Sequence, residues 1–401
     1  MTYLEDKLIV LGVSGGISAY RSCELARLLA ADGARVQAVL TEAACELVGP
    51  LTFQALTGRP AACGRAGAGA AGGMPHIDLG READAVVVAP ATANTLARLA
   101  CGMADNLLCA VVLASECPVI LAPAMNTRMW RNHATRENTA RLVKRKRFVQ
   151  VGPASGSLAC GEDGPGRMEE PPVILAALRR ALGPGDLAGR RLLVTAGPTR
   201  EPLDPVRYLS NRSSGKTGYA LAAAAWRRGA EVTLVTGPVG LAPPAGVRVV
   251  AVETAAQMAA AVTGRLEASD ALVMAAAVAD FRPKRAAKAK IKKAEGTPAV
   301  ELVATRDILA AVARKRHGCV VVGFAAETGD PLPAARDKLA RKKLDLVVAN
   351  DVSRPDAGFD RDTNKVILVD ARGAEELDTL PKDQVAERIL DRLAGLLSSS
   401  G

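Results

Sequence analysis

Short runs of apolar residues recur along this chain, and most of them end in a turn that leads into a stretch with helical character. We predict strands in the first half at residues 7–12, 35–40, 85–89, 119–122 and 148–152, and in the second half at 191–195, 231–236, 271–277, 320–325 and 346–349. Continuous apolar runs that alternate with helices are typical of parallel strands covered on both faces. The pattern predicts an α/β chain with two Rossmann-like three-layer domains and mainly parallel sheets, the first of them flavodoxin-like.

The two halves are separated by a stretch with linker composition, Leu-Gly-Pro-Gly-Asp-Leu-Ala-Gly at 182–189. We expect a first domain at residues 1–183, a linker at 184–190 and a second domain at 191–401. Residues 59–74 are rich in Gly and Ala, and we expect a flexible surface excursion there. Thr254 and Gln257 have the spacing of a capping box, which predicts that a helix begins between them.

Composition and charge restrict the partners. A net charge of +10 admits nucleic acid or phosphorylated small molecules. Aromatic residues are only 3% of the chain, which is too few for recognition by base stacking, so we expect no nucleic-acid partner. The first seven residues include Glu5 and Asp6 and lack the apolar stretch of a secretion signal, and no apolar run approaches the roughly 18 residues of a membrane span. We therefore expect a cytoplasmic protein with no membrane partner.

The eight cysteines contain no CxxC pair and no Cys/His zinc spacing. In a chain of this size we expect no disulfide framework, which is consistent with a reducing compartment. With only three histidines, a site built from several His ligands is close to excluded.

Polar loops follow several predicted strands of the first half. The turn at 13–20, Val-Ser-Gly-Gly-Ile-Ser-Ala-Tyr, opens a helix, where free N–H groups and the helix dipole favour a phosphate. The loop at 90–95 brings hydroxyls and an amide to another helix start, where they cap the helix or bind a ligand. The loop at 123–130, Pro-Ala-Met-Asn-Thr-Arg-Met-Trp, suits a flat, partly apolar molecule fixed by a hydrogen bond. Open α/β sheets bind ligands at this edge.

Two further side chains of the first half could carry proton transfer. His76 follows the Gly-rich excursion, and an imidazole that titrates near neutrality can act as a base. Cys160 lies in a glycine-dense loop, residues 156–171, which is poor core material and could close over a site as a lid. Structural roles are the alternative for both residues.

Together these motifs resemble the flavin-dependent cysteine decarboxylases, in particular phosphopantothenoylcysteine decarboxylase. The resemblance implies that His76 is a base, that Asn126 grips the substrate carboxylate, and that Cys160 is the proton donor of a substrate-recognition flap. FMN would supply the electron sink that loss of CO₂ from a cysteine amide requires. The FMN contacts implied are Gly15, Gly16, Ile17, Ser18, Thr41, Thr92, Asn94, Thr95 and Met125.

In the second half, basic residues and an acid follow predicted strands. Gly-Lys-Thr at 215–217 suggests a P-loop, but the spacing fails because Ser210 stands where the first glycine should be. The lysine-rich run at 284–293 follows Asp280, and lysines beside an acid suit a triphosphate with Mg²⁺. On charge alone, this run could equally be a solvated or nucleic-acid-binding segment.

The second half resembles phosphopantothenate–cysteine ligase, apart from Thr217, where that family usually has Met. The resemblance implies that CTP activates 4′-phosphopantothenate as an acyl-cytidylate, from which the amine of cysteine displaces CMP. Lys290 would offset phosphate charge, while Asn211 and Arg207 would hold the substrate and the acyl intermediate. Asp280 is also a candidate Mg²⁺ ligand. The nucleotide contacts implied are Met274, Ala275, Ala276, Asp280, Lys290, Thr305, Arg306, Asp307, Ile308, Phe324, Lys338 and Lys342.

The resemblance covers nearly the whole chain and predicts a fused enzyme for two consecutive steps toward coenzyme A. It also implies homo-oligomers, with decarboxylase trimers that share flavin sites and ligase dimers, up to a dodecamer. Three alternatives are weighed against it. A regulatory flavoprotein subunit would lack the flap cysteine or the second domain, an NAD(P) oxidoreductase should show GxGxxG, and a nucleic-acid-binding protein would carry no flavin.

Overall fold

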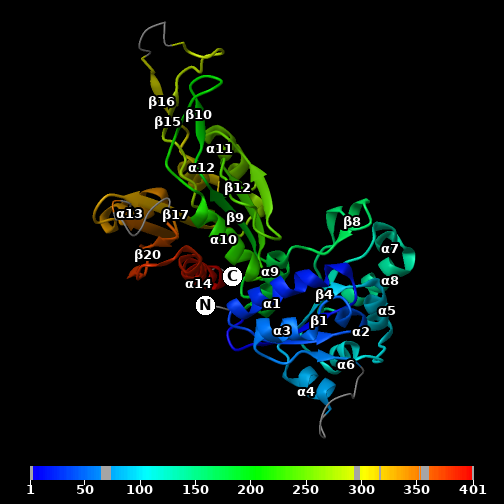
Figure 1. Ribbon diagram of the computed structural model, residues 1–401. Helices are drawn as coiled ribbons and strands as arrows, with labels where there is room; N and C mark the ends of the chain where they lie inside the picture. Colours follow the sequence, from blue (N-terminus) through cyan, green and yellow to red (C-terminus); the bar gives the residue numbers. More distant parts are fainter. Residues whose placement is uncertain are drawn as a thin grey trace. The chain divides into compact units, whose positions relative to one another are not determined.

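The computed structural model describes residues 3–64, 74–292, 299–315, 318–351, 353 and 361–399. The chain divides into two compact units, Thr2–Gly183 and Pro184–Gly401 (Figure 1). Each unit has a largely parallel sheet with helices on both faces, so the prediction of two Rossmann-like, three-layer α/β domains is confirmed. Among the described residues, no helix combines the length and apolar character needed to cross a membrane.

The first unit contains a sheet of six parallel strands in the order β3-β2-β1-β4-β5-β6. These strands are β1 (Leu8–Val13), β2 (Arg35–Leu40), β3 (Ala62–Cys63), β4 (Ala85–Ala91), β5 (Val119–Pro123) and β6 (Phe148–Gln150). This is the 3-2-1-4-5-6 order of a dinucleotide-binding fold, and not the 2-1-3-4-5 order of flavodoxin. The order reverses between β1 and β4, and the loops after these two strands diverge and leave a crevice.

Helices cover both faces of this sheet. They are η1 (Ile17–Tyr20), α1 (Arg21–Ala31), α2 (Glu42–Cys45), α3 (Pro50–Thr57), α4 (Pro75–Glu82), α5 (Ala93–Cys101), α6 (Leu107–Ala114), α7 (Thr127–Arg131), α8 (His133–Val143) and α9 (Pro171–Leu182). Helices α1 and α9 lie on one side and α6 on the other (Figure 1). On the α6 side, Val86 and Val88 of β4 pack with Leu108 of α6. The glycine-dense loop forms a hairpin, β7 (Ala154–Ser157) and β8 (Asp163–Arg167).

The second unit repeats the doubly wound arrangement in a sheet of eight strands, ordered β13-β12-β9-β14-β17-β18-β20-β21. The strands are β9 (Arg191–Ala196), β12 (Glu231–Thr236), β13 (Arg248–Ala251), β14 (Ala271–Met274), β17 (Val320–Glu327), β18 (Leu346–Asp351), β20 (Val366–Asp370) and β21 (Gly373–Glu376). Only β20 and β21 are antiparallel to their neighbours. The order reverses between β9 and β14, which again marks a crevice.

Alternate side chains of these strands enter two separate cores. Leu192 and Val194 face α10 (Lys216–Arg227) and α14 (Lys382–Ser399), whereas Leu193 faces the opposite core. The helices of that opposite core are α11 (Ala255–Thr263), α12 (Ile308–Lys315) and α13 (Leu332–Lys342). The predicted capping box is confirmed at the start of α11. The short 3-10 turn η2 (Leu266–Ala268) follows α11.

Short antiparallel ribbons interrupt the loops of the second unit. The ribbon strands are β10 (Arg200–Pro202), β11 (Tyr208–Ser210), β15 (Phe281–Pro283), β16 (Leu302–Ala304), β19 (Thr363–Asn364) and β22 (Leu380–Pro381). The β10–β11 ribbon occupies the loop that follows β9, and the β15–β16 ribbon follows β14 (Figure 1). These loops carry most of the residues expected to bind the ligase substrates.

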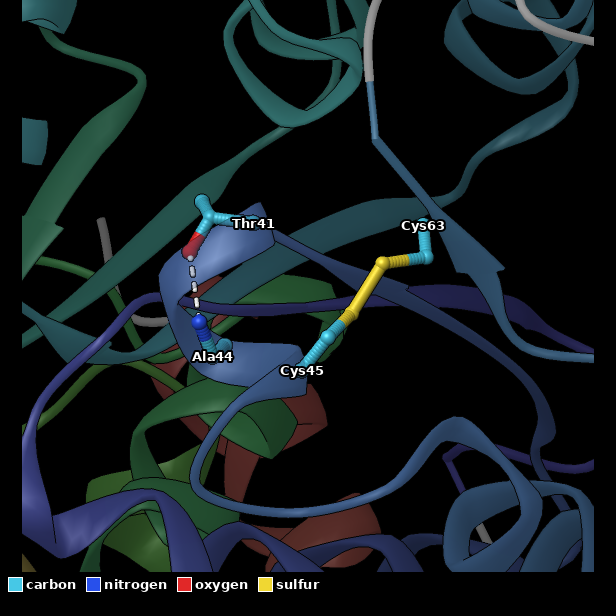
Figure 2. Close-up of a disulfide and its surroundings, with 4 residues drawn as sticks. All are labelled: Thr41, Ala44, Cys45 and Cys63. Carbon is cyan, nitrogen blue, oxygen red and sulfur yellow. Dashed lines mark hydrogen bonds between the residues drawn. A yellow bond between two sulfur atoms is a disulfide. The ribbon is translucent and has the colours of Figure 1, made fainter.

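Two expectations need correction, namely the flexible surface excursion at residues 59–74 and the absence of disulfides. Ala62 and Cys63 form the edge strand β3, so these residues belong to the sheet and not to a flexible excursion, and residues 65–73 lie outside the described part of the chain. Cys63 also forms a disulfide with Cys45 at the end of α2, next to Thr41 (Figure 2). Because β3 pairs with β2 in a register that sets Cys63 opposite Leu40, the chain brings together two cysteines that are 18 residues apart. That pairing depends on the strand order, which cysteine spacing does not reveal.

The disulfide should stabilise the first unit by restricting its unfolded chain. Closing a loop of 18 residues is worth about 3 kcal/mol. We expect Cys63→Ser to lower the free energy of urea unfolding by about that amount without reductant, and to match the wild type once dithiothreitol is present. Cys101→Ser, at an exposed free cysteine, is the control and should change little. Equal stabilities of Cys63→Ser and wild type without reductant would contradict the prediction.

Candidate active sites

A pocket of about 1300 Å³ opens in the first unit at the carboxyl edge of its sheet. Its walls come from the loops after β1, β2, β4 and β5 and from the β7–β8 hairpin. All nine residues expected to contact FMN line it, namely Gly15, Gly16, Ile17, Ser18, Thr41, Thr92, Asn94, Thr95 and Met125. Asn126 and Cys160 line the same pocket.

The two loops at the switch point are tied together by a buried hydroxyl. Ser14, which is 1% exposed, donates from Oγ to the carbonyl of Pro90 at 2.7 Å and accepts from the amide of Thr92 at 3.0 Å. Thr92 then caps α5, with Oγ1 accepting from the amide of Thr95 at 3.4 Å. These bonds fix the backbone on both sides of the crevice before any ligand arrives.

Position 15 has no room for a side chain, and position 16 has little, where the first loop meets its neighbours. A Cβ on Gly15 would lie 2.4 Å from the Cβ of Ala43, and one on Gly16 would lie 3.3 Å from Cγ2 of Thr92. The pocket thus combines a closely packed glycine turn, hydroxyls, and the apolar side chains of Ile17 and Met125. Such a lining fits a flat aromatic ring with a polar, phosphorylated tail.

Asn126 and Cys160 meet at the hairpin side of the pocket. Nδ2 of Asn126 lies 3.1 Å from Sγ of Cys160 and donates to Oε2 of Glu162 at 2.9 Å. The Oδ1 atom of Asn126 accepts from the amide of Arg128 at 2.7 Å, and this bond caps α7. Because Oδ1 is held by its own helix, Nδ2 is the end of the amide that faces the flap.

His76 is not brought into this pocket by its own chain. It lies in the first turn of α4, which packs against α6, and it is absent from the residues that line the pocket. Its Nδ1 atom is buried and has no hydrogen-bond partner among the described residues, which leave out 65–73 just before α4. An unsatisfied buried imidazole nitrogen is costly, and none of the residues that the structure describes satisfies this one.

Several pocket residues were missed by the sequence analysis. The charged or polar ones are Arg21, Glu42, Arg98, Asp105, Asn106 and Arg167. Arg98 pairs with Asp105 at 3.0 Å, and Arg21 donates to the carbonyl of Met168 at 3.0 Å. A usable signal was present in Asp105 and Asn106, two polar residues directly before an apolar run, because Asn and Asp are preferred where a helix begins. Asn106 in fact caps α6, which begins at Leu107.

The second unit holds a buried carboxylate that fixes two segments of its candidate site. Asp204 accepts from Nη2 of Arg207 at 2.6 Å, from the amides of Val206 and Arg207 at 2.8 Å each, and from the amide of Ile291 at 3.2 Å. Arg207 also donates to the carbonyl of Ile291 at 2.7 Å. The pair therefore clamps the backbone directly after Lys290, whose own side chain is exposed.

Asn211 is held at the loop that follows β14, where Nδ2 donates to the carbonyl of Val278 at 2.9 Å. Two buried hydroxyls support this region: Oγ1 of Thr195 accepts from the amide of Ala276 at 3.1 Å, and Oγ1 of Thr199 accepts from the amide of Ala279 at 3.0 Å. They tie the loop after β9 to the loop after β14, as Ser14 does in the first unit.

The expected nucleotide residues lie on neighbouring loops and on α13. Lys338 donates to the carbonyl of Phe324 at 2.6 Å, and Lys342 pairs with Asp307 at the start of α12. Burial lowers the pKa of Lys338, although the charges of Glu327, Asp280 and Asp307 oppose that shift.

The remaining residues expected to bind the nucleotide lie at the end of β14, in the loop after it and at the start of α12. Thr305 donates to the carbonyl of Ala279 at 2.7 Å, and its amide donates to the carbonyl of Asp280 at 2.9 Å. Met274 is the last residue of β14, and Ala275 and Ala276 follow it directly. Arg306 is exposed and Ile308 is buried. In the described part of the chain, no three His, Cys, Asp or Glu side chains gather as metal ligands. Lys293, the last residue of the lysine-rich run, lies outside the described residues.

The sequences of both units are similar to those of known proteins. Residues 2–183 match the family model described as flavoprotein, and residues 187–397 match the DNA/pantothenate metabolism flavoprotein C-terminal domain. Three curated relatives carry the name coenzyme A biosynthesis bifunctional protein CoaBC. The relative from Vibrio cholerae is 46% identical over 97% of this chain and 98% of its own length. The relative from Mycobacterium bovis is 49% identical over 98% of this chain and 97% of its own length. The relative from Escherichia coli is 47% identical over 97% of both chains.

The Asp204 clamp should make the stability of the second unit depend on pH. The side-chain hydrogen bond from Arg207, together with three backbone amides, holds the pKa of Asp204 well below its usual range. A carboxyl with a depressed pKa stabilises the fold above its unfolded pKa of about 3.9, and this contribution is lost as the pH falls. We expect Asp204→Asn to lower the thermal midpoint at neutral pH and to flatten its fall between about pH 5 and pH 3.

The control for this measurement is Asp163→Asn, which removes an exposed carboxylate from the other unit. Its midpoint should fall with pH as steeply as that of the wild type. If Asp204→Asn showed the same slope as the wild type, the clamp would not be charged in the way its geometry indicates.

Proposed function

This chain belongs to the family of the coenzyme A biosynthesis bifunctional proteins, and we propose that its second unit joins cysteine to 4′-phosphopantothenate and its first unit decarboxylates the product. The chain covers nearly the full length of its relatives, so both activities reside in one polypeptide. The observation that carries the proposal is the pocket in which Asn126 and Cys160 lie 3.1 Å apart beside the residues expected for FMN.

In the first unit, bound FMN supplies a reversible two-electron oxidation at the substrate thiol, which makes loss of CO₂ accessible. The glycine turn and Ser18 would hold its phosphate, and Met125 would lie against its ring. Asn126 holds the carboxylate that leaves the substrate. Cys160 then delivers a proton to the carbon that has lost CO₂.

His76 serves as the base at the pocket of a neighbouring copy of this chain. Its position on α4 and its unpartnered Nδ1 atom support a role completed by another copy. Apolar side chains near the pocket and on the approach to α4 are exposed in the single chain, including Ile17, Tyr20 and Met74, each at 65%. A homo-oligomer would bury such side chains. We propose decarboxylase trimers, joined by ligase dimers through the second unit.

In the second unit, CTP activates the carboxylate of 4′-phosphopantothenate, with release of pyrophosphate, and cysteine then displaces CMP. Lys290 offsets charge on the phosphates, and the Asp204–Arg207 clamp on Ile291 supports its placement. Asn211 holds the substrate beside β14. Lys338 and Lys342 contact the nucleotide once it displaces their intramolecular partners.

We also propose that Mg²⁺ enters with the nucleotide. Asp280 offers one carboxylate near Lys338 and Asp307. Mg²⁺ commonly takes one or two carboxylates, phosphate oxygens and water rather than a cage of protein ligands, so a single acid suits it. A purely regulatory flavoprotein is disfavoured, because Cys160 lines the pocket and the ligase half is present.

The decisive assay supplies 4′-phosphopantothenate, cysteine, Mg²⁺ and either CTP or ATP, and follows nucleotide monophosphate and CO₂ in the same sample. The proposal expects CO₂ to depend on prior consumption of CTP. It also expects CO₂ without any nucleotide when 4′-phosphopantothenoylcysteine is supplied directly. Absence of CO₂ in both conditions would overturn the decarboxylase assignment.

Lys290→Gln should separate the two activities. Loss of the ammonium leaves the developing phosphate charge without its partner, and we expect ligation to fall by about 100-fold or more. Decarboxylation of supplied 4′-phosphopantothenoylcysteine should stay at the wild-type rate, because that site lies in the other unit. Lys288→Gln, two residues earlier in the same exposed run, is the matched control and should be affected much less.

Cys160→Ser should uncouple CO₂ release from product formation. A serine hydroxyl is a far weaker acid than a thiol, so the final proton transfer should slow by about 100-fold or more, while the step that releases CO₂ still occurs. We expect one equivalent of CO₂ per site without 4′-phosphopantetheine, measured in a single-turnover experiment. Normal yields of 4′-phosphopantetheine would remove Cys160 from the mechanism.

A further inference from the structure

Glu162 lies beside Asn126 and Cys160, two of the first-unit residues to which the proposed function assigns chemistry. Its Oε2 atom accepts from Nδ2 of Asn126 at 2.9 Å, and the same nitrogen lies 3.1 Å from Sγ of Cys160. Its other oxygen, Oε1, is 3.4 Å from Nη2 of Arg128. The steps described above give this carboxylate no role, although it holds the amide that must grip the substrate.

The backbone around Glu162 fixes this arrangement. At the hairpin tip, the amide of Leu158 donates to the carbonyl of Glu162 and the amide of Gly161 donates to the carbonyl of Leu158, each at 2.9 Å. At the hairpin base, the amide of Met125 donates to the carbonyl of Gly166 at 2.9 Å. A Cβ on Gly166 would lie 2.2 Å from the carbonyl oxygen of Met125. The hairpin therefore lies directly on the loop that carries Asn126.

We propose that the carboxylate of Glu162 occupies, in the free enzyme, the position on Asn126 that the substrate carboxylate takes. This inference rests on the proposed decarboxylase function. The side chain of glutamate ends in the same chemical group that the substrate loses as CO₂. Nδ2 already has two partners, Cys160 and Glu162, so a second carboxylate can accept from it only by replacing one of them, and Glu162 is the one that presents the same chemical group.

Arg128 provides an alternative partner for the displaced carboxylate. It already lies within 3.4 Å of Oε1, and its side chain is 87% exposed, so it can follow Glu162 outward. The side chain of Glu162 is 38% exposed, so its charge remains partly hydrated during the exchange. Glu162 thus competes with ligands for the amide of Asn126. The ligands that can replace it are those with a carboxylate near the reacting thiol.

The test compares Glu162→Gln with Asp163→Asn in the FMN-loaded full-length enzyme, using supplied 4′-phosphopantothenoylcysteine. Both variants keep the side-chain shape and remove one negative charge from the same hairpin, but only Glu162 contacts Asn126. Charge-assisted hydrogen bonds are about twice as strong as neutral ones, so Glu162→Gln should lower KM about fivefold with kcat within about twofold. Asp163→Asn should leave both constants near the wild type.

A second measurement uses the product as a ligand. Because 4′-phosphopantetheine lacks the carboxylate, it does not need to displace Glu162, so its inhibition constant should be the same for Glu162→Gln and the wild type. A gain in affinity confined to the substrate would support the competition. Equal gains for substrate and product would show a general loosening of the hairpin and would overturn it.

Two other results would also overturn the inference. An unchanged KM in Glu162→Gln, with an active wild type, would mean that the two carboxylates do not compete. A fall in kcat of about tenfold or more, equivalent to about 1.4 kcal/mol, would mean that Glu162 orients Asn126 during chemistry. If the wild type released no CO₂ at all, the proposed function itself would fail, and this outcome is distinct from the others.

Discussion

Three buried hydroxyls support both candidate sites. Each lies at the point where the strand order of its sheet reverses: Ser14 after β1, and Thr195 and Thr199 at the end of β9 and just after it. All three are at most 1% exposed, and each binds the backbone of the loop after the next strand in the sheet. A parallel sheet leaves these loops free to diverge, and a bond across the gap holds them at a fixed separation. Leaving such a buried partner unpaired costs about 1–3 kcal/mol, so the crevices are maintained by the fold itself.

The side chains that would contact substrates are organised differently, since most of them are engaged with one another. Asn126 binds Glu162, Lys338 binds the carbonyl of Phe324, and Lys342 binds Asp307. These internal bonds keep polar groups satisfied in the ligand-free chain, and a ligand must exchange with them instead of entering an unpaired site. Selectivity then depends on which ligand replaces the internal partner best. On the β7–β8 hairpin, Glu162 is the internal partner that a substrate carboxylate would have to replace on Asn126.

Much of the local structure was accessible from sequence. The strand ending at Leu40, the capping box at Thr254 and Gln257, and the glycine turn at Gly15 all follow from short-range patterns. Other features were not accessible. The disulfide of Cys45 with Cys63 depends on β3 pairing with β2, and the contact of Glu162 with Asn126 depends on where the hairpin rests. Each of these two contacts joins segments that are distant in the sequence, and no hydrophobic periodicity or residue spacing shows that they meet.

The sequence by itself determined the two doubly wound units, because apolar runs and glycine turns act over a few residues, where propensity and steric freedom decide the outcome. It also nominated the chemical groups, through the motifs that contain Asn126 and Cys160. Only the tertiary structure decided which groups meet. It placed Asn126, Cys160 and Glu162 within hydrogen-bond distance and left His76 on α4, outside the pocket of its own chain. Contacts between distant segments depend on strand order and on the resting position of a hairpin, and both are set by the packing of the whole unit.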